Sequence, residues 1–165
     1  MPSALPPFRR RHYRSGAQLW RDLRQLAALR AQRHGAVAPA LRERLMLVVT
    51  AVNQCRYCAV FHTRAARLSG LAPDEVALLL GGQLQHAPAA EMPALVYAHA
   101  WAAADGAPAR GSYAQLVAIY GPEAAAGMER VLQVIRIGNL LGNTADYLLF
   151  RLSGGRLGQH ADIAG

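Results

Sequence analysis

Apolar residues recur every three or four positions along most of this chain, and the alternating apolar and polar runs of half-buried strands are nearly absent. This spacing follows the helical repeat of about 3.6 residues and lines apolar side chains along one face of a helix. Alanine, leucine and arginine, which all favour helices, dominate the composition. Glycines and prolines divide the pattern into segments. The sequence therefore predicts an all-α protein with helices at about 16–34, 40–53, 55–69, 73–80, 89–105, 112–120 and 121–152.

Several polar residues and glycines indicate how these helices begin, end and meet. Ser15 and Ser112 are suitable N-caps, and the pair Asn53-Gln54 is expected to break the chain between two helices. In the last helix, two glycines and two asparagines each recur at a spacing of four. This pattern predicts a close approach between helices in the core, with the asparagines hydrogen-bonded across it and in no catalytic role (Gly138, Gly142, Asn139 and Asn143).

The 165 residues correspond in length to one domain. Hydrophobic residues make up 53% and charged residues only 17%, so we expect additional apolar surface to be buried in a homo-oligomer. No apolar run reaches the roughly 18 residues of a membrane span, and the first residues lack the apolar stretch of a secretory signal. These features predict a cytoplasmic protein without a membrane partner.

Positive charge is concentrated at the start of the chain. The net charge is +8, and residues 1–34 hold eight arginines and a single acid, Asp22. We expect a solvated basic N-terminal arm and helix at 1–34, a helical domain at 35–152 and a flexible tail at 153–165. An anionic partner is the alternative for the arm. A nucleic-acid partner is not predicted, because no recognisable DNA- or RNA-binding motif is present.

The chemistry-bearing part of the chain is the stretch around its only two cysteines, Cys55 and Cys58. His62 follows one helical turn later, so the three side chains would share one face of a helix. Glu43 lies on the preceding helix, within reach of His62. Two thiols beside an imidazole and a carboxylate predict a redox or nucleophilic site. Two alternatives remain open, namely a pair of buried structural cysteines and a zinc site formed by these four residues.

The spacing Glu43-x11-Cys55-x2-Cys58-x3-His62 resembles the active-site signature of the AhpD-like alkylhydroperoxidases, within the carboxymuconolactone decarboxylase family. The resemblance implies an AhpD-like helical bundle assembled as trimers or hexamers. It also implies that Glu43, Cys58 and His62 form a proton relay while the cysteines cycle between dithiol and disulfide. The substrate would be an organic hydroperoxide or a partner disulfide, and a separate thiol would act as reductant. Peroxidase members carry a histidine immediately before the second cysteine, where this chain has Tyr57.

Within this site we expect Cys58 to be the base-activated thiol and Cys55 the more exposed partner. Tyr57 is a candidate for hydrogen bonding to a peroxide or thiolate, with an aromatic lid as the alternative, and Arg56 is a candidate for stabilising a thiolate. No glycine-rich phosphate loop follows a strand, so no flavin or nicotinamide is predicted, and we expect neither a haem nor a metal cofactor. A lactone decarboxylase and a non-enzymatic redox-sensing protein are the competing functions.

Overall fold

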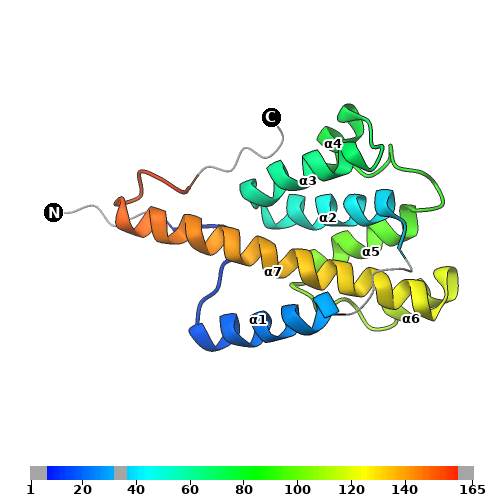
Figure 1. Ribbon diagram of the computed structural model, residues 1–165, viewed down its shortest axis with the longest axis horizontal. Helices are drawn as coiled ribbons and strands as arrows, with labels where there is room; N and C mark the ends of the chain where they lie inside the picture. Colours follow the sequence, from blue (N-terminus) through cyan, green and yellow to red (C-terminus); the bar gives the residue numbers. More distant parts are fainter. Residues whose placement is uncertain (1–6, 32–36, 160–165) are drawn as a thin grey trace.

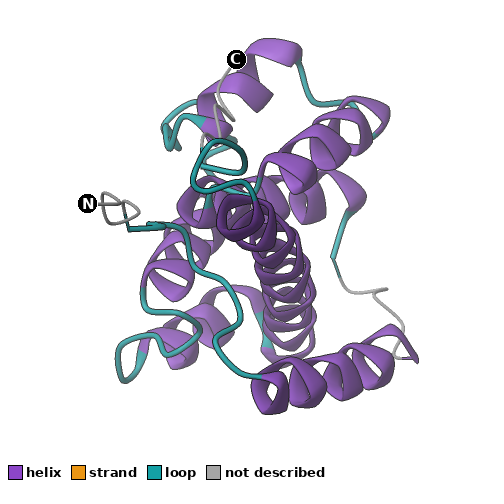
Figure 2. Cartoon of the chain, turned by 90° about the vertical axis from the view of Figure 1, so that its left-hand side faces the viewer, coloured by secondary structure: helices purple, strands orange, loops and turns teal. Residues whose placement is uncertain are grey.

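The computed structural model describes residues 7–31 and 37–159, and within these ranges the chain forms helices joined by turns and loops (Figure 2). The predicted all-α fold is confirmed. The described part contains seven helices: α1 (Gly16–Ala31), α2 (Pro39–Asn53), α3 (Arg56–Leu68), α4 (Pro73–Leu80), α5 (Met92–Ala103), α6 (Ser112–Tyr120) and α7 (Pro122–Leu152).

The long helix α7 runs along the molecule, with α1 on one side and α2 and α3 on the other (Figure 1). Helix α2 is packed against α3, α4, α5 and α7. After the charged residues Arg42, Glu43 and Arg44, it is mostly apolar from Leu45 to Val52, as suits a helix enclosed by others. Its side chains Leu45, Leu47, Val48 and Val49 are all buried. The contact between α2 and α7 therefore forms the centre of the core, and α3 lies beside it.

Most helices begin and end near the residues predicted from the sequence, with a few local differences. The Ser15 hydroxyl accepts a hydrogen bond from the N–H of Gln18 at 3.2 Å, so the predicted N-cap of α1 is confirmed. Ser112 is the first residue of α6 rather than its cap, because Gly111 precedes it with a φ of 84° that favours glycine. Helix α5 begins at Met92, since residues 89–91 form turns. The expected extension of the first helix to residue 34 lies partly outside the described residues.

The described residues nearest the two termini are more closely tied to the fold than the sequence suggested. Arg10 is only 6% exposed and bonds to Asp146 of α7, so the expectation that the basic arm is solvated is wrong at this residue. Helix α1 itself packs on α7. Of the expected flexible tail, residues 153–155 form a turn and 156–158 a bend, and the carbonyl of Gly158 accepts a hydrogen bond from Arg10. Residues 160–165 of that tail lie outside the described ranges.

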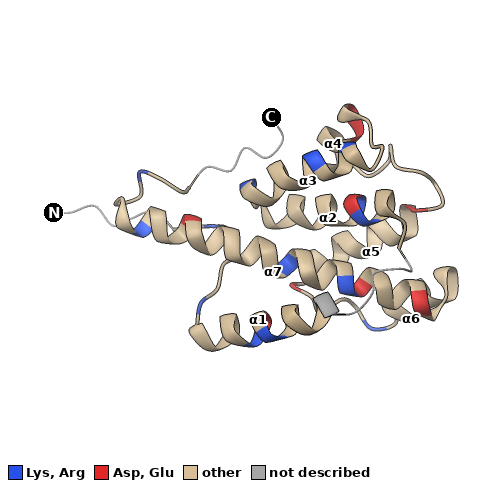
Figure 3. Cartoon of the chain, viewed as in Figure 1, with Lys and Arg blue, Asp and Glu red and all other residues tan. Residues whose placement is uncertain are grey.

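Charged residues are sparse, and most of the ribbon carries neither an acid nor a base (Figure 3). Among the described residues, no helix combines the length and the apolar character that crossing a membrane requires.

Candidate active site

The turn between α2 and α3 places Cys55 at the start of α3. Gln54 takes a left-handed conformation with φ of 54°, and its N–H bonds to the carbonyl of Thr50 at 2.8 Å. The predicted break at Asn53-Gln54 is thus confirmed. Cys55 is then extended and occupies the N-cap of α3, where its sulfur accepts the N–H of Cys58 at 3.4 Å. A sulfur in this position faces the unpaired N–H groups of the helix, which favour a negative charge.

The two cysteine sulfurs lie 2.9 Å apart and are both free thiols. Cys55 is fully buried, whereas Cys58 is only partly buried. The expectation that Cys55 is the more exposed partner is therefore wrong. The N-cap conformation explains the difference, because it turns the Cys55 side chain back under the first turn of α3 and toward α7. Cys58 is the sulfur that a molecule from solvent meets first.

The two thiols share one hydrogen bond, and this bond sets their ionisation. It lowers the pKa of Cys55 to about 7, against burial, which acts in the opposite direction. The N–H groups of Cys58 and Tyr57 add to the lowering. The same shared bond, burial and the charge on Cys55 raise the pKa of Cys58 above its ordinary value. The pair therefore holds a single negative charge near neutral pH, and this charge first resides on Cys55 rather than on Cys58 as the sequence suggested.

Glu43 and His62 are in direct contact, as their spacing predicted. The Glu43 Oε2 atom lies 2.8 Å from His62 Nδ1, and Arg42 bonds to the other carboxylate oxygen at 3.3 Å. Burial raises the pKa of Glu43, but the hydrogen bond and charge of His62, with a smaller contribution from Arg42, outweigh it and keep the pKa below its usual value. An ionised Glu43 holds the proton of His62 on Nδ1 and leaves Nε2 for proton exchange.

His62 lies one turn after Cys58 on the same face of α3. Among the described residues no hydrogen bond joins its ring to either sulfur. The structure thus unites two pairs, Cys55 with Cys58 and Glu43 with His62, on neighbouring turns. Transfer between these pairs needs a bound substrate or water to bridge them.

Two glycines of α7 make room for the sulfurs. A Cβ atom at Gly142 would lie 2.6 Å from Cys55 Sγ and 3.2 Å from the Tyr57 ring, while one at Gly138 would lie 3.9 Å from Cys58 Sγ. The close helix approach predicted from the glycine spacing is therefore present, and it occurs at the dithiol. Sequence reasoning did not assign these glycines to the site. The signal that could have linked these glycines to the site is their separation of four residues, close to the separation of three between Cys55 and Cys58.

The buried asparagines of α7 hold the end of α2 against α7. Asn139 Nδ2 donates to Thr50 Oγ1 at 3.1 Å, and Asn53 Nδ2 donates to Asn139 Oδ1 at 3.1 Å. Asn143 Nδ2 donates to the carbonyl of Asn53 at 2.7 Å. The predicted hydrogen bonds of the asparagines across the helix contact are thus confirmed. They fix the turn that carries Cys55.

Asp146 is a further residue of the site that the sequence did not reveal. Its carboxylate is fully buried and accepts hydrogen bonds from Arg10 at 2.7 Å, Arg56 at 2.6 Å and the Tyr57 hydroxyl at 2.8 Å. The side chains of Arg56 and Tyr57, both candidates for contact with a thiolate or substrate, are thus engaged with Asp146. The contacts of Asp146 could not be inferred from the sequence, because its partners Arg56 and Arg10 lie 90 and 136 residues away.

Replacing Asp146 with asparagine should lower the free energy of unfolding by about 3 kcal/mol at pH 7, because two arginines lose their buried counter-charge. Burial raises the pKa of Asp146, but the bonds from Arg10, Tyr57 and Arg56 outweigh it and leave the pKa below its usual value. The ionised carboxylate therefore stabilises the fold above about pH 4, and this contribution is lost as the pH falls through the lowered pKa. Denaturant titrations of both proteins between pH 2 and 7 measure the effect.

The matched control is Asp105→Asn, which removes an acid that is about half exposed in its ion pair with Arg136. Such pairs contribute at most about 1 kcal/mol. Equal stability losses in the two variants, or an unchanged acid dependence in Asp146→Asn, would contradict the assigned network.

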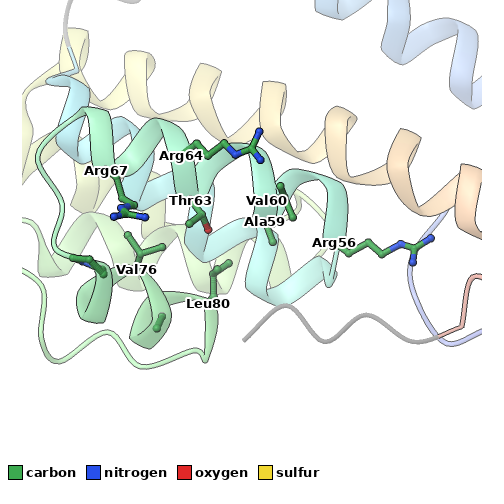
Figure 4. Close-up of a pocket in the computed structure, with 10 residues that line it drawn as sticks. Arg56, Ala59, Val60, Thr63, Arg64, Arg67, Val76 and Leu80 are labelled. Atoms are coloured by element: carbon green, nitrogen blue, oxygen red, sulfur yellow. The ribbon is translucent and has the colours of Figure 1, made fainter. Parts of the chain in front are cut away.

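A groove of about 540 Å³ lies between α3 and α4 (Figure 4). The helical spacing of its lining residues puts it on the side of α3 that faces away from Cys58. Neither cysteine lines it. Its walls combine arginines with apolar side chains, including Arg56, Val60, Thr63, Arg67, Val76 and Leu80. The described residues contain no group of three His, Cys, Asp or Glu side chains placed to hold a metal ion. The four residues weighed as zinc ligands form the two separate pairs described above.

Comparison with protein families matches residues 16–104 to the Carboxymuconolactone decarboxylase family. Comparisons with curated proteins and with solved structures gave no match. The family match spans more than half of the chain and includes Glu43, Cys55, Cys58 and His62. Together with the all-helical fold, this match shows that the chain belongs to the carboxymuconolactone decarboxylase family.

Proposed function

We propose that this protein is a thiol-dependent oxidoreductase that reduces organic hydroperoxides by cycling Cys55 and Cys58 between dithiol and disulfide. The observation that carries the proposal is the pair of sulfurs 2.9 Å apart at the start of α3, where the pKa of Cys55 is lowered to about 7. A thiolate is the nucleophilic form of cysteine, and sulfurs 2.9 Å apart need to approach by only about 1 Å to reach the length of a disulfide bond. Family membership supports an enzymatic role, and the contact of Glu43 with His62 supplies a route for protons.

The first half of the reaction begins when one proton crosses from Cys58 to Cys55, which leaves the charge on the accessible sulfur. Cys58 then attacks the outer oxygen of the hydroperoxide, so that an S–O bond forms and the O–O bond breaks. The departing alkoxide takes a proton that His62 Nε2 relays from solvent, and it leaves as an alcohol. Glu43 orients His62 for this transfer through their 2.8 Å contact. Cys58 is now a sulfenic acid.

In the second half, the sulfur of Cys55 attacks the sulfur of the Cys58 sulfenic acid. The S–S bond forms, the S–O bond breaks, and the leaving hydroxide takes the Cys55 proton to become water. The hydroperoxide has then gained two electrons and the dithiol has lost them. An external dithiol restores the pair by thiol–disulfide exchange and is itself oxidised to a disulfide.

A single-turnover experiment tests this function. Reduced protein, freed of reductant, is mixed with one equivalent of cumene hydroperoxide, and the thiols, alcohol product and intact mass are followed. We expect one alcohol for each chain, the loss of both thiols and a mass that falls by two hydrogens. Hydroperoxide that persists while both thiols remain would refute the proposed function.

We also propose that copies of this chain associate, because α3 exposes large apolar side chains. Phe61 is 67% exposed and Leu68 is 91% exposed, and both lie outside the core. Light scattering coupled to size-exclusion chromatography should give the mass of an oligomer for the wild type and a smaller mass for Phe61→Glu. A wild type that runs as a monomer at all concentrations would overturn this expectation.

A further inference from the structure

The carboxamide of Asn139 has one hydrogen-bond donor that the contacts between helices do not use. The side chain is fully buried. Its oxygen accepts from Asn53, and one of its two N–H groups donates to Thr50, both at 3.1 Å. A primary amide carries two N–H donors, and a buried donor without a partner is costly. The second N–H must therefore find an acceptor inside the core.

The two cysteine sulfurs, which can accept a hydrogen bond, lie next to this part of α7. Gly138, which precedes Asn139, approaches Cys58 Sγ. Gly142, three residues after Asn139, approaches Cys55 Sγ. Asn139 lies between them on the same helix, so its side chain projects beside the two sulfurs, and its influence lowers the pKa of each cysteine. Glycine on either side removes the Cβ atoms that would otherwise separate α7 from the dithiol.

We propose that Asn139 is a further catalytic residue, whose free N–H donates to whichever of the two sulfurs carries the negative charge. The bonds to Thr50 and Asn53 fix the amide, so that this donor stays directed at the sulfurs while the charge moves from Cys55 to Cys58. A donor that is already oriented stabilises the charge without reorganisation during the reaction. The role in catalysis rests on the proposed dithiol cycle, whereas the stabilisation of the thiolate does not.

The direct test is the ionisation of the dithiol in Asn139→Ala and in the control Thr50→Val. Asn139→Ala should raise the midpoint of Cys58 alkylation by iodoacetamide by about one pH unit, because a hydrogen bond to a charged sulfur is lost. Thr50→Val removes a different partner of the same amide and should shift the midpoint far less. Circular dichroism first establishes that both variants are folded. A folded Asn139→Ala protein with the wild-type midpoint, or equal shifts in both variants, would overturn the proposal.

A measurement on the wild type keeps the proposal testable if the alanine variant does not fold. The two carboxamide protons of Asn139 are followed by nuclear magnetic resonance of ¹⁵N-labelled, reduced protein between pH 5 and 9. One of them should shift to higher frequency with the same midpoint as the thiol. Carboxamide protons that show no titration would overturn the proposal. Because neither experiment contains a peroxide, a protein that ionises as expected but fails the single-turnover assay would refute only the peroxidase function.

Discussion

Gly142→Ala should reduce hydroperoxide turnover at least about 100-fold, because the added methyl group occupies space that the sulfur of Cys55 needs. Its Cβ would lie 2.6 Å from that sulfur and 3.2 Å from the Tyr57 ring. Cys55 cannot simply move aside, since it caps α3 and lies beneath α7. A displacement of about 1 Å at reacting atoms commonly costs such a factor. Turnover and the rate of Cys55–Cys58 disulfide formation measure the loss.

Gly138→Ala is the matched control on the same helix. Its Cβ would lie 3.9 Å from Cys58 Sγ, an ordinary contact distance. Since alanine favours a helix over glycine by about 1 kcal/mol, this variant should be as stable as the wild type or more stable, with turnover within about threefold. Gly142→Ala should instead lose about 1–3 kcal/mol to overpacking, partly offset by the same helical preference. Equal behaviour of the two variants would show that α7 does not shape the dithiol site.

Cys58→Ser and Cys55→Ser should both stop the cycle, but at different steps. Cys58→Ser removes the accessible sulfur and should abolish reaction with the hydroperoxide, leaving only the uncatalysed rate. Cys55→Ser retains the attacking sulfur and removes the partner that completes the disulfide. It should therefore accumulate a sulfenic acid at Cys58, at a slower rate because the shared hydrogen bond with a neighbouring thiol is gone.

Trapping with dimedone followed by peptide mass spectrometry identifies the oxidised residue in each variant. The control is the double variant, which should show neither adduct nor hydroperoxide loss. A sulfenic acid on Cys55 in the Cys58→Ser protein would reverse the assigned order of attack. Turnover that survives in both single variants would exclude a mechanism based on this pair of thiols.

The parts of the site that are local in sequence could be predicted. Cys55, Cys58 and His62 lie within three turns of one helix segment, and Glu43 lies on the helix that folds back against it. The helical repeat brings the first three to one face, and the short turn between α2 and α3 brings Glu43 beside them. The same repeat, with its glycine and proline punctuation, located each helix to within a few residues.

The parts contributed by distant segments could not be predicted. Gly142 reaches Cys55, and Asp146 reaches Arg56 and Tyr57, only because α7 packs across α2 and α3, about 90 residues later in the chain. A basic N-terminal stretch gives no local sign that Arg10 is buried against an acid 136 positions later. The order of exposure of the cysteines also depended on tertiary structure, because the N-cap conformation and the neighbouring α7 together bury Cys55.

The proposed chemistry requires two adjacent thiols that share one proton and hold a thiolate at neutral pH. The most direct measurement is the rate of Cys58 alkylation by iodoacetamide as a function of pH in the reduced wild-type protein. The charge of the pair reaches the accessible sulfur by proton transfer, so the rate should rise with a midpoint near pH 7 that belongs to the pair. A single midpoint at or above about 8.5, the value of an ordinary cysteine, would contradict the account.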